Sequence, residues 1–218
     1  MVPTPISPAN ETQTTDVANR LPFEVPPRPK SEGAAPHRLP RWRVFVAALL
    51  NPSGVRPDDI AFIPWILALT ISGTAFGLFF LQTGLDRLQV GTLDLVGVAV
   101  MGVVGLLYGT LGVLILALFA WIILLVAGSR TKPQDVVRGF ALAYSTTLVA
   151  LILGLVAHML LGWRTAVAFG VAGVLWALGP MNSALRRMAA GKTVLSLILA
   201  SICGAALLLG WALLGGVP

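Results

Sequence analysis

The chain has 218 residues, of which 56% are hydrophobic and 11% are charged, and its mean hydropathy is +0.86. This composition is far more apolar than a soluble domain of the same size tolerates, so it excludes an ordinary soluble globular protein. The formal net charge is +6, but the basic residues lie at the borders of apolar runs. This placement argues against a nucleic-acid partner and predicts an integral membrane protein.

The first 59 residues differ from the rest of the chain. Residues 1–39 are rich in proline and poor in large apolar side chains, so they cannot bury enough surface to offset the entropy of ordering. We expect a disordered cytoplasmic tail there. Residues 40–59 begin with Arg41, Trp42 and Arg43 ahead of apolar residues, which predicts an amphipathic segment and linker lying against anionic lipid headgroups.

Residues 60–218 are divided into five apolar runs that lack charged side chains. About 20 apolar residues are enough for a helix to cross roughly 30 Å of hydrocarbon. The sequence therefore predicts an all-α fold, an integral membrane bundle of five transmembrane helices. The expected spans are about 60–81, 104–126, 139–161, 166–185 and 193–214.

The second run, 95–129, is longer than one simple crossing needs. Its 35 residues would form a helix of about 50 Å, whereas two crossings with a turn need roughly 40 residues or more. We therefore expect one crossing, with residues 95–103 approaching it along or partly within the outer leaflet.

The basic residues predict the orientation, because cytoplasmic borders retain Lys and Arg. With five crossings, one side receives only Arg87 and Arg164. The other side receives Arg20, Arg28, Lys30, Arg38, Arg41, Arg43, Arg56, Arg130, Lys132, Arg138, Arg186, Arg187 and Lys192. This distribution places the N-terminus in the cytoplasm and the C-terminus outside.

Two further groups of residues are assigned from this topology. The charged residues of the first outer loop, Asp86, Arg87 and Asp94, are expected to be solvated, and an outer-surface site is the alternative. Tryptophan prefers the membrane interface, and four of these residues fall near predicted helix ends, whereas Trp176 is deeper and is expected to pack between helices. The four are Trp65, Trp121, Trp163 and Trp211.

Small residues recur at a spacing of four in three of the predicted helices. Such a spacing places them on one helical face, where they let two backbones approach closely. We expect them to pack helices within the chain, and a homodimer contact is the alternative. The pairs are Gly73 with Gly77, Gly105 with Gly109, and Ala200 with Gly204.

Polar side chains inside the third span are candidate functional residues. Tyr144, Ser145, Thr146 and Thr147 form a cluster whose hydroxyls are expected to bond backbone carbonyls of neighbouring helices, with a substrate pathway as the alternative. His158 is an intramembrane ionisable residue, so a proton carrier or ligand role is one hypothesis. The other is a neutral imidazole near the outer helix end, hydrogen-bonded to a neighbouring helix.

The sequence gives no positive sign of an enzyme, because the predicted spans hold no Asp or Glu at membrane depth. Ser145 and His158 are separated by about 20 Å along one helix and cannot meet. Cys203 is the single cysteine, so a cysteine metal cage is excluded and no cofactor is predicted.

Several short motifs occur in a defined order along the chain. The first is Leu49-Leu50-Asn51-Pro52-Ser53-Gly54, ahead of the first helix. The others follow the second helix: Ala127-Gly128-Ser129, Thr131-Lys132-Pro133, Val136-Val137-Arg138 and Ala143-Tyr144-Ser145. In this order the motifs resemble the Yip family of Ypt/Rab-interacting membrane proteins, in its bacterial branch. The resemblance covers roughly 46–214 and implies a five-span helical fold.

The eukaryotic branch of that family is associated with small GTPases and vesicle traffic, and the chain departs from it. The Asp-Leu-Tyr-Gly-Pro segment typical of that branch is absent, since Asp94-Leu95 is followed by Val96 and Tyr108-Gly109 by Thr110. No GTPase site is therefore carried over to this sequence.

Two functional hypotheses follow from these features. The first is a non-catalytic membrane protein, expected in a bacterial inner membrane, that organises or recruits lipid or an unknown protein partner, with a homo-oligomer also open. Its membrane contacts would be the anionic headgroups at the cytoplasmic face. The alternative is a transporter or channel component with a polar path near Tyr144 to Thr147 and His158.

Overall fold

The computed structural model describes residues 43, 46, 47, 50 and 62–215. The chain divides into two compact units, Met1–Arg38 and Leu39–Pro218, and all described residues belong to the second. The tail predicted at 1–39, together with Arg41 and Trp42, lies outside the described residues. So does most of the 40–59 segment, of which Arg43, Val46, Ala47 and Leu50 are described, with helical backbone and exposed side chains.

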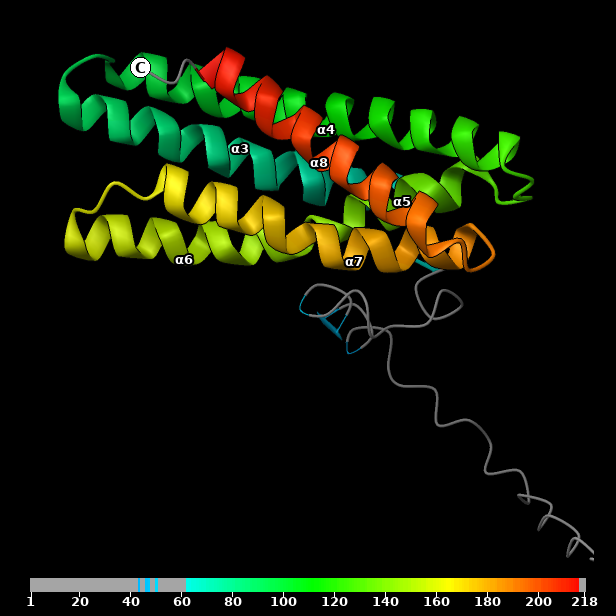
Figure 1. Cartoon of the computed structure of the whole chain (residues 1–218). Coiled ribbons are helices and arrows are strands. Elements are labelled where there is room, and N and C mark those ends of the chain that lie inside the picture. The colour runs from blue at the N-terminus through cyan, green and yellow to red at the C-terminus, as the bar shows by residue number, and fades with distance from the viewer. Residues whose placement is uncertain (1–42, 44–45, 48–49, 51–61, 216–218) are drawn as a thin grey trace, which may run out of the picture. The chain divides into compact units, whose positions relative to one another are not determined.

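Every regular element in the described part of the chain is a helix, and five helical segments are long and apolar enough to cross a membrane (Figure 1). The segments are Trp65–Val90, Leu95–Val126, Pro133–Leu161, Ala166–Met188 and Thr193–Gly215. This confirms the prediction of an all-α, multi-pass membrane protein with five membrane-spanning helices.

The first two spans form an antiparallel hairpin of α3 (Trp65–Val90) and α4 (Leu95–Val126). The chain turns at Gly91, whose φ of 77° lies in the left-handed region that glycine adopts without a Cβ penalty. Asp94 then caps α4, because its side chain accepts a hydrogen bond from the Gly97 amide at 2.7 Å. A glycine in the left-handed conformation ends α3 and an aspartate caps α4, so a short loop connects the two long helices.

The lead-in expected at residues 95–103 is instead the beginning of α4, which is continuous over 32 residues. Its length is about 48 Å, so it exceeds the hydrocarbon thickness and requires tilt or extension into the headgroup layer. The physical reason is packing on α3: Val98 is 3% exposed, and a Cβ built on Gly84 would lie 3.1 Å from its Cα. Contact with α3 therefore holds residues 95–103 in the bundle.

The third span is made of two helices, α5 (Pro133–Ala143) and α6 (Ser145–Leu161), with an interruption at Tyr144. Proline at the start of α5 costs no hydrogen bond, because the first helical N–H groups have no intrahelical acceptor. Most of α5 is buried, and it contacts α3, α4 and α7. The span thus begins earlier than the predicted 139–161.

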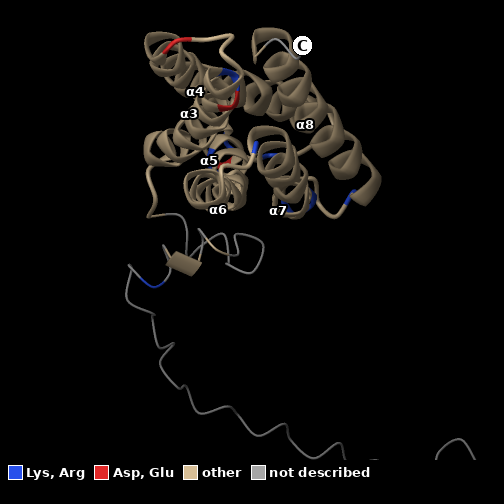
Figure 2. Ribbon diagram, turned by 90° about the vertical axis from the view of Figure 1, so that its left-hand side faces the viewer, with Lys and Arg blue, Asp and Glu red and all other residues tan. Residues whose placement is uncertain are grey.

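The fourth span begins with a π-helical turn, η1 (Ala166–Val171), and continues as α7 (Ala172–Met188). The helix α7 remains continuous through Pro180. After a turn in which Gly191 has a φ of 84°, α8 (Thr193–Gly215) packs on α7 and contacts α3 and α4. Viewed along the bundle, α6 and α7 lie on one side, α4 and α8 on the other, with α3 and α5 between them (Figure 2).

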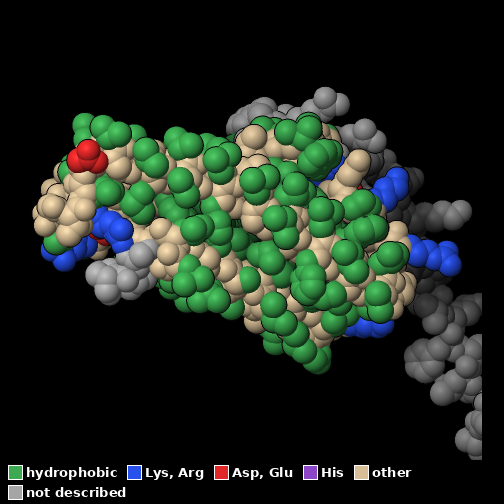
Figure 3. Space-filling model, turned by 90° about the horizontal axis from the view of Figure 1, so that it is seen from above, with side chains coloured by type: hydrophobic (Ala, Val, Ile, Leu, Met, Phe, Trp, Pro, Cys, Tyr) green, Lys and Arg blue, Asp and Glu red, His purple; other side chains and the backbone are tan. Residues whose placement is uncertain are grey.

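The apolar surface of the bundle is largely exposed, as expected for a protein whose solvent is lipid (Figure 3). The expectation for Trp176 is wrong: instead of packing between helices, it is 67% exposed. Trp211 lies near the end of α8, as predicted, and in addition is 6% exposed, stacks on Phe79 at 4.5 Å and donates from Nε1 to the Thr83 hydroxyl at 3.1 Å. Which tryptophan faces the interior depends on the direction in which it projects from its helix, and its depth along the helix does not specify that direction.

Candidate functional site

The small-residue pairs of α3 and α4 face one another inside the chain. A Cβ built on Gly109 would lie 2.6 Å from the Phe76 Cβ and 2.8 Å from the Ser72 carbonyl oxygen. One on Gly105 would lie 2.6 Å from the Phe76 carbonyl oxygen, and those on Gly73 and Gly77 would meet α4. The glycines therefore allow close backbone approach within this hairpin, which is the intramolecular packing expected from their spacing.

The pair on α8 is also an internal contact. Ala200 is 1% exposed, and a Cβ built on Gly204 would lie 2.4 Å from Leu178 Cδ2 of α7. The small side chains of α8 thus receive a bulky side chain from α7.

The polar cluster at the start of α6 is buried: Tyr144, Ser145 and Thr147 are 0% exposed and Thr146 is 7% exposed. The Thr147 hydroxyl donates to the Gly173 carbonyl of α7 at 2.8 Å, as expected for a hydroxyl that links two helices. The Thr146 hydroxyl instead donates within its own segment, to the Ala143 carbonyl at 3.0 Å. The interruption between α5 and α6 places Tyr144 against Phe76, with ring centroids 5.3 Å apart.

An amide that sequence reasoning did not single out bridges the interior. Gln82 of α3 is 0% exposed and donates from Nε2 to the Leu151 carbonyl of α6. Its position inside a charge-free run was the only signal, because a lone intramembrane amide must find a partner helix. Gln82 and Thr147 therefore tie α6 to its neighbours on both sides.

His158 lies at the end of the bundle that carries loops 91–94 and 162–165, which we call the Asp86 end. Its Nδ1 is 2.9 Å from the Trp163 carbonyl oxygen and 3.4 Å from Asp86 Oδ1, and its Nε2 is 3.4 Å from Gln89 Nε2. A carbonyl only accepts, so the N–H at Nδ1 donates to the Trp163 carbonyl oxygen. The ring thus links its own loop to α3.

The expectation that Asp86 and Arg87 belong to a solvated loop is wrong, because both lie within α3. The Asp86 side chain is 14% exposed. Its two carboxylate oxygens accept from the backbone amides of Thr165 at 3.3 Å and Ala166 at 3.0 Å. The first amides of a helical segment lack intrahelical acceptors, and the helix dipole favours an anion there. Asp86 therefore supplies the missing acceptors at the start of η1.

The opposite end, which carries Pro64 and loops 127–132 and 189–192, is the cationic end. Within the described residues it holds six basic side chains and one acidic side chain, Asp135. The basic residues are Arg130, Lys132, Arg138, Arg186, Arg187 and Lys192. Among the residues that the structure describes, the Asp86 end has two of each sign, namely Arg87, Arg164, Asp86 and Asp94. The two ends thus differ in charge by the asymmetry that the sequence predicted.

Backbone contacts brace the loops of the cationic end. The Ser129 hydroxyl donates to the Met188 carbonyl at 2.8 Å, which joins loop 127–132 to the end of α7. Trp121 donates from Nε1 to the Thr131 carbonyl at 3.0 Å, and the Lys192 ammonium donates to the Ala127 carbonyl at 2.8 Å. Backbone carbonyls at the ends of α4 and α7 and in loop 127–132 therefore hold these loops in place.

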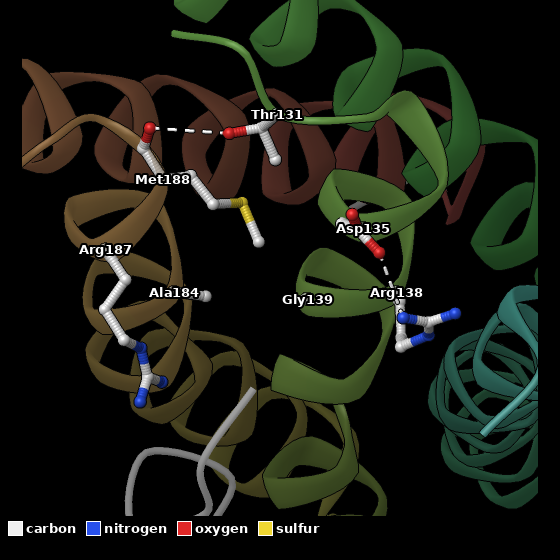
Figure 4. A pocket seen from close by; sticks show the side chains of 7 residues that line it. All are labelled: Thr131, Asp135, Arg138, Gly139, Ala184, Arg187 and Met188. Atoms are coloured by element: carbon white, nitrogen blue, oxygen red, sulfur yellow. Dashed lines mark hydrogen bonds and ion pairs between the residues drawn. The ribbon is translucent and has the colours of Figure 1, made fainter. Parts of the chain in front are cut away.

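A pocket of about 260 Å³ opens between α5 and α7 at the cationic end (Figure 4). Its lining residues are Thr131, Asp135, Arg138, Gly139, Ala184, Arg187 and Met188. On the α5 wall, Arg138 donates from Nε to the Ile63 carbonyl at 2.8 Å and from Nη1 to Asp135 at 3.0 Å. The expected polar residues Tyr144 to Thr147 and His158 do not line this pocket.

The sequence analysis assigned Arg138 and Arg187 to the cytoplasmic border and did not predict that they line the same pocket. The spacing of these residues was an available signal, because residues at i, i+3 and i+4 share one face of a helix. One such set is Asp135, Arg138 and Gly139, and the other is Ala184, Arg187 and Met188.

No family model matches the chain, and no curated protein or solved structure is significantly similar to it. The resemblance to the Yip family therefore remains a proposal.

Proposed function

We propose that the protein is a non-catalytic, Yip-like membrane protein of the bacterial branch that organises or recruits lipid or protein partners. In this proposal it resides in a bacterial inner membrane with the cationic end in the cytoplasm. The observation that carries the proposal is the charge difference between the two ends of the bundle, together with a pocket at the cationic one. Cytoplasmic borders retain Lys and Arg, and the cytoplasmic leaflet attracts basic segments.

The polar contacts of the Asp86 end support a structural role for Asp86 and His158, whose carboxylate and imidazole contact each other. Asp86 accepts two backbone amides, and His158 contacts the Trp163 carbonyl and Gln89. A general base needs its reacting atom directed at a substrate, and here these atoms are directed at the backbone and at each other. This arrangement supports the non-catalytic proposal.

The transporter alternative requires a polar path that joins the start of α6 to His158. The two lie about 20 Å apart along α6, and the Thr147 hydroxyl is bonded to the Gly173 carbonyl. Gln82 and the tightly packed Gly154 lie between them, since a Cβ built on Gly154 would be 2.8 Å from Phe169 Cβ. Close packing along this route favours recruitment over transport.

Topology reporters test the orientation on which the proposal depends. A reporter fused before Met1 should be active in the cytoplasm, and one fused after Pro218 should be active on the other side. A reporter inserted in loop 189–192 should behave like the first, because that loop belongs to the cationic end. Reporters at both termini found in one compartment would refute the odd number of crossings.

Deletion of residues 1–39 tests recruitment. Crosslinking in native membranes should show capture of a defined partner band by the full chain and loss of that band in the deletion. The matched control replaces residues 1–39 with a Gly/Ser linker of equal length, which should also lose the band while membrane insertion and expression are unchanged. Equal capture by all three chains would reject a recruiting role for the tail.

A further inference from the structure

One side of α7 is directed away from the other helices of the bundle. Trp176, Gly179 and Ser183 stand at i, i+3 and i+7, so they share one face of this helix. Trp176 is 67% exposed and lies close to the middle of the fourth span, Ala166–Met188. The helix itself lies at the periphery of the bundle (Figure 2). We call this surface of Trp176, Gly179 and Ser183 the Trp176 face.

Gly179 differs from the other glycines that lie inside helices in the described part of the chain. A Cβ built on Gly179 meets no atom within 4 Å, whereas a Cβ on each of the others meets at least one atom within that distance. Gly179 and Ser183 are two small residues four positions apart, a spacing that lets two membrane helices approach closely. At Gly179, however, none of the described helices makes such an approach.

Polar groups of the Trp176 face need partners that the described residues do not supply. The Trp176 indole N–H and the Ser183 hydroxyl form no hydrogen bond with any residue that the structure describes. The carbonyl of Trp176 lacks its usual intrahelical donor, because residue 180 is a proline. Hydrocarbon holds no water that could replace these bonds, and an indole prefers the headgroup layer. Two donors and an acceptor therefore lie on a surface that faces lipid.

We propose that the Trp176 face binds the same face of a second copy, so that the protein forms a dimer through paired α7 helices. Two copies inserted with the same topology pair about a twofold axis along the membrane normal, which makes their α7 helices parallel. A face with both donors and an acceptor is complementary to itself across such an axis, because each copy supplies what the other lacks. Gly179 lies at the closest approach, with Trp176 and Ser183 on either side of it.

Two features select a second copy as the occupant of the Trp176 face. An acyl chain covers an apolar surface but offers no acceptor to the indole N–H and no donor to the Trp176 carbonyl. A second copy carries both groups at the same membrane depth. The small residues of α3 and α4 are already filled within the chain, so self-association is assigned to α7. This inference does not depend on the proposed recruitment of partners.

Energy transfer between full-length chains in liposomes tests the dimer. Two dyes are attached at Thr92→Cys, in an exposed loop, while the native Cys203 is buried. Energy transfer should rise with the protein-to-lipid ratio along the binding curve of a dimer, and unlabelled chain should compete it away. Transfer that never exceeds the level of random proximity would overturn the proposal.

Gly179→Leu tests the closest approach. The leucine side chain enters open space in one chain but separates two paired helices, so dimerisation should weaken by about tenfold or more. The matched control is Ala205→Leu, at an exposed position near the middle of the fifth span, which should change dimerisation by less than about twofold. Equal effects of the two variants would overturn the assignment to α7.

Trp176→Phe tests the polar pairing, because it removes the N–H and keeps an aromatic ring. A symmetric dimer loses one such bond in each copy, so dimerisation should weaken by about threefold to eightfold. Trp163→Phe is the control, since Trp163 is also exposed but lies in loop 162–165, and it should leave dimerisation unchanged. Unchanged dimerisation in Trp176→Phe would overturn the pairing that selects a second copy.

Disulfide crosslinking in membranes locates the contact. In chains that also carry Cys203→Ala, oxidation by copper phenanthroline should join Gly179→Cys into dimers and leave the control Ala205→Cys monomeric. Crosslinking of Gly179→Cys to a different protein and not to itself would overturn self-association. Circular dichroism and detergent melts establish that each variant is folded.

Discussion

The two ends of the bundle treat their charged side chains differently. At the Asp86 end, the carboxylate of Asp86 is 14% exposed and accepts from two backbone amides, with His158 beside it. At the cationic end, Asp135 is 45% exposed, and Arg138 and Arg187 line an open pocket. One end buries its carboxylate against backbone amides, whereas the other leaves its carboxylate more exposed beside a pocket.

The contacts of each charged residue distinguish those that hold the structure together from those that are candidates for function. An ionisable residue inside a membrane protein is a functional hypothesis by default, which made His158 a candidate in the sequence beside the hypothesis of a neutral, hydrogen-bonded imidazole. Its partners are a loop carbonyl and two side chains of α3, so its contacts are those of a helix connector. Basic residues at a membrane border are usually read as topology signals, yet two of them lie on facing walls of a pocket.

The largest effect on the free energy of unfolding is expected for Asp86→Ala. The change leaves the Thr165 and Ala166 amides without an acceptor and removes a contact of His158, so we expect the free energy of unfolding to fall by about 3 kcal/mol. An SDS titration of the protein in detergent micelles measures it. The control Asp94→Ala removes only the α4 cap and should cost about 1 kcal/mol. Equal effects at both positions would show that Asp86 is not a special internal acceptor.

The second prediction concerns the α3 and α4 hairpin that connects the two ends. Gly109→Ala places a Cβ against Phe76 and the Ser72 carbonyl and should lower the free energy of unfolding by about 2 kcal/mol. Gly179→Ala is the matched control, because no atom lies within 4 Å of its added Cβ. That change should be neutral or stabilising by up to about 1 kcal/mol in the same titration. Similar losses in both variants would contradict the assigned packing.

The smallest effect is expected at the cationic end. Arg138→Gln removes the hydrogen bond to the Ile63 carbonyl and a partly exposed ion pair with Asp135, and should lower the free energy of unfolding by about 1 kcal/mol. Arg138→Lys, which keeps the charge but loses the fork of donors, should recover less than half of that loss. A loss as large as that of Asp86→Ala would remove the distinction between the ends.

Much of the fold was accessible from apolar patterning alone. Five runs without charges predicted five helices, and four-residue spacing of small residues predicted that Gly105 and Gly109 pack helices within the chain. These features depend on neighbours along one helix, where the period is known. The residues 95–103 and the segment 133–138 were placed outside the spans, because the sequence does not report contacts such as Val98 with Gly84.

The candidate sites were less accessible, because each joins segments far apart in the chain. Asp86 looked like a loop residue since Arg87 and Asp94 follow closely, and nothing local reports that Thr165 and Ala166 present their amides to it. The pocket joins the start of the third span to the end of the fourth. Its residues appear in the sequence only as two separate basic borders.

The amino-acid sequence by itself determined that the chain is a membrane protein, how many helices cross and which borders are basic. Those properties depend on the summed free energy of transferring side chains from water to lipid. The contribution of each side chain depends little on residues far away in the sequence. Only the tertiary structure decided that Asp86 and His158 face each other and that Arg138 and Arg187 share a pocket. Such pairings depend on the rotation of each helix about its axis, which is set by how the packed helices fit together.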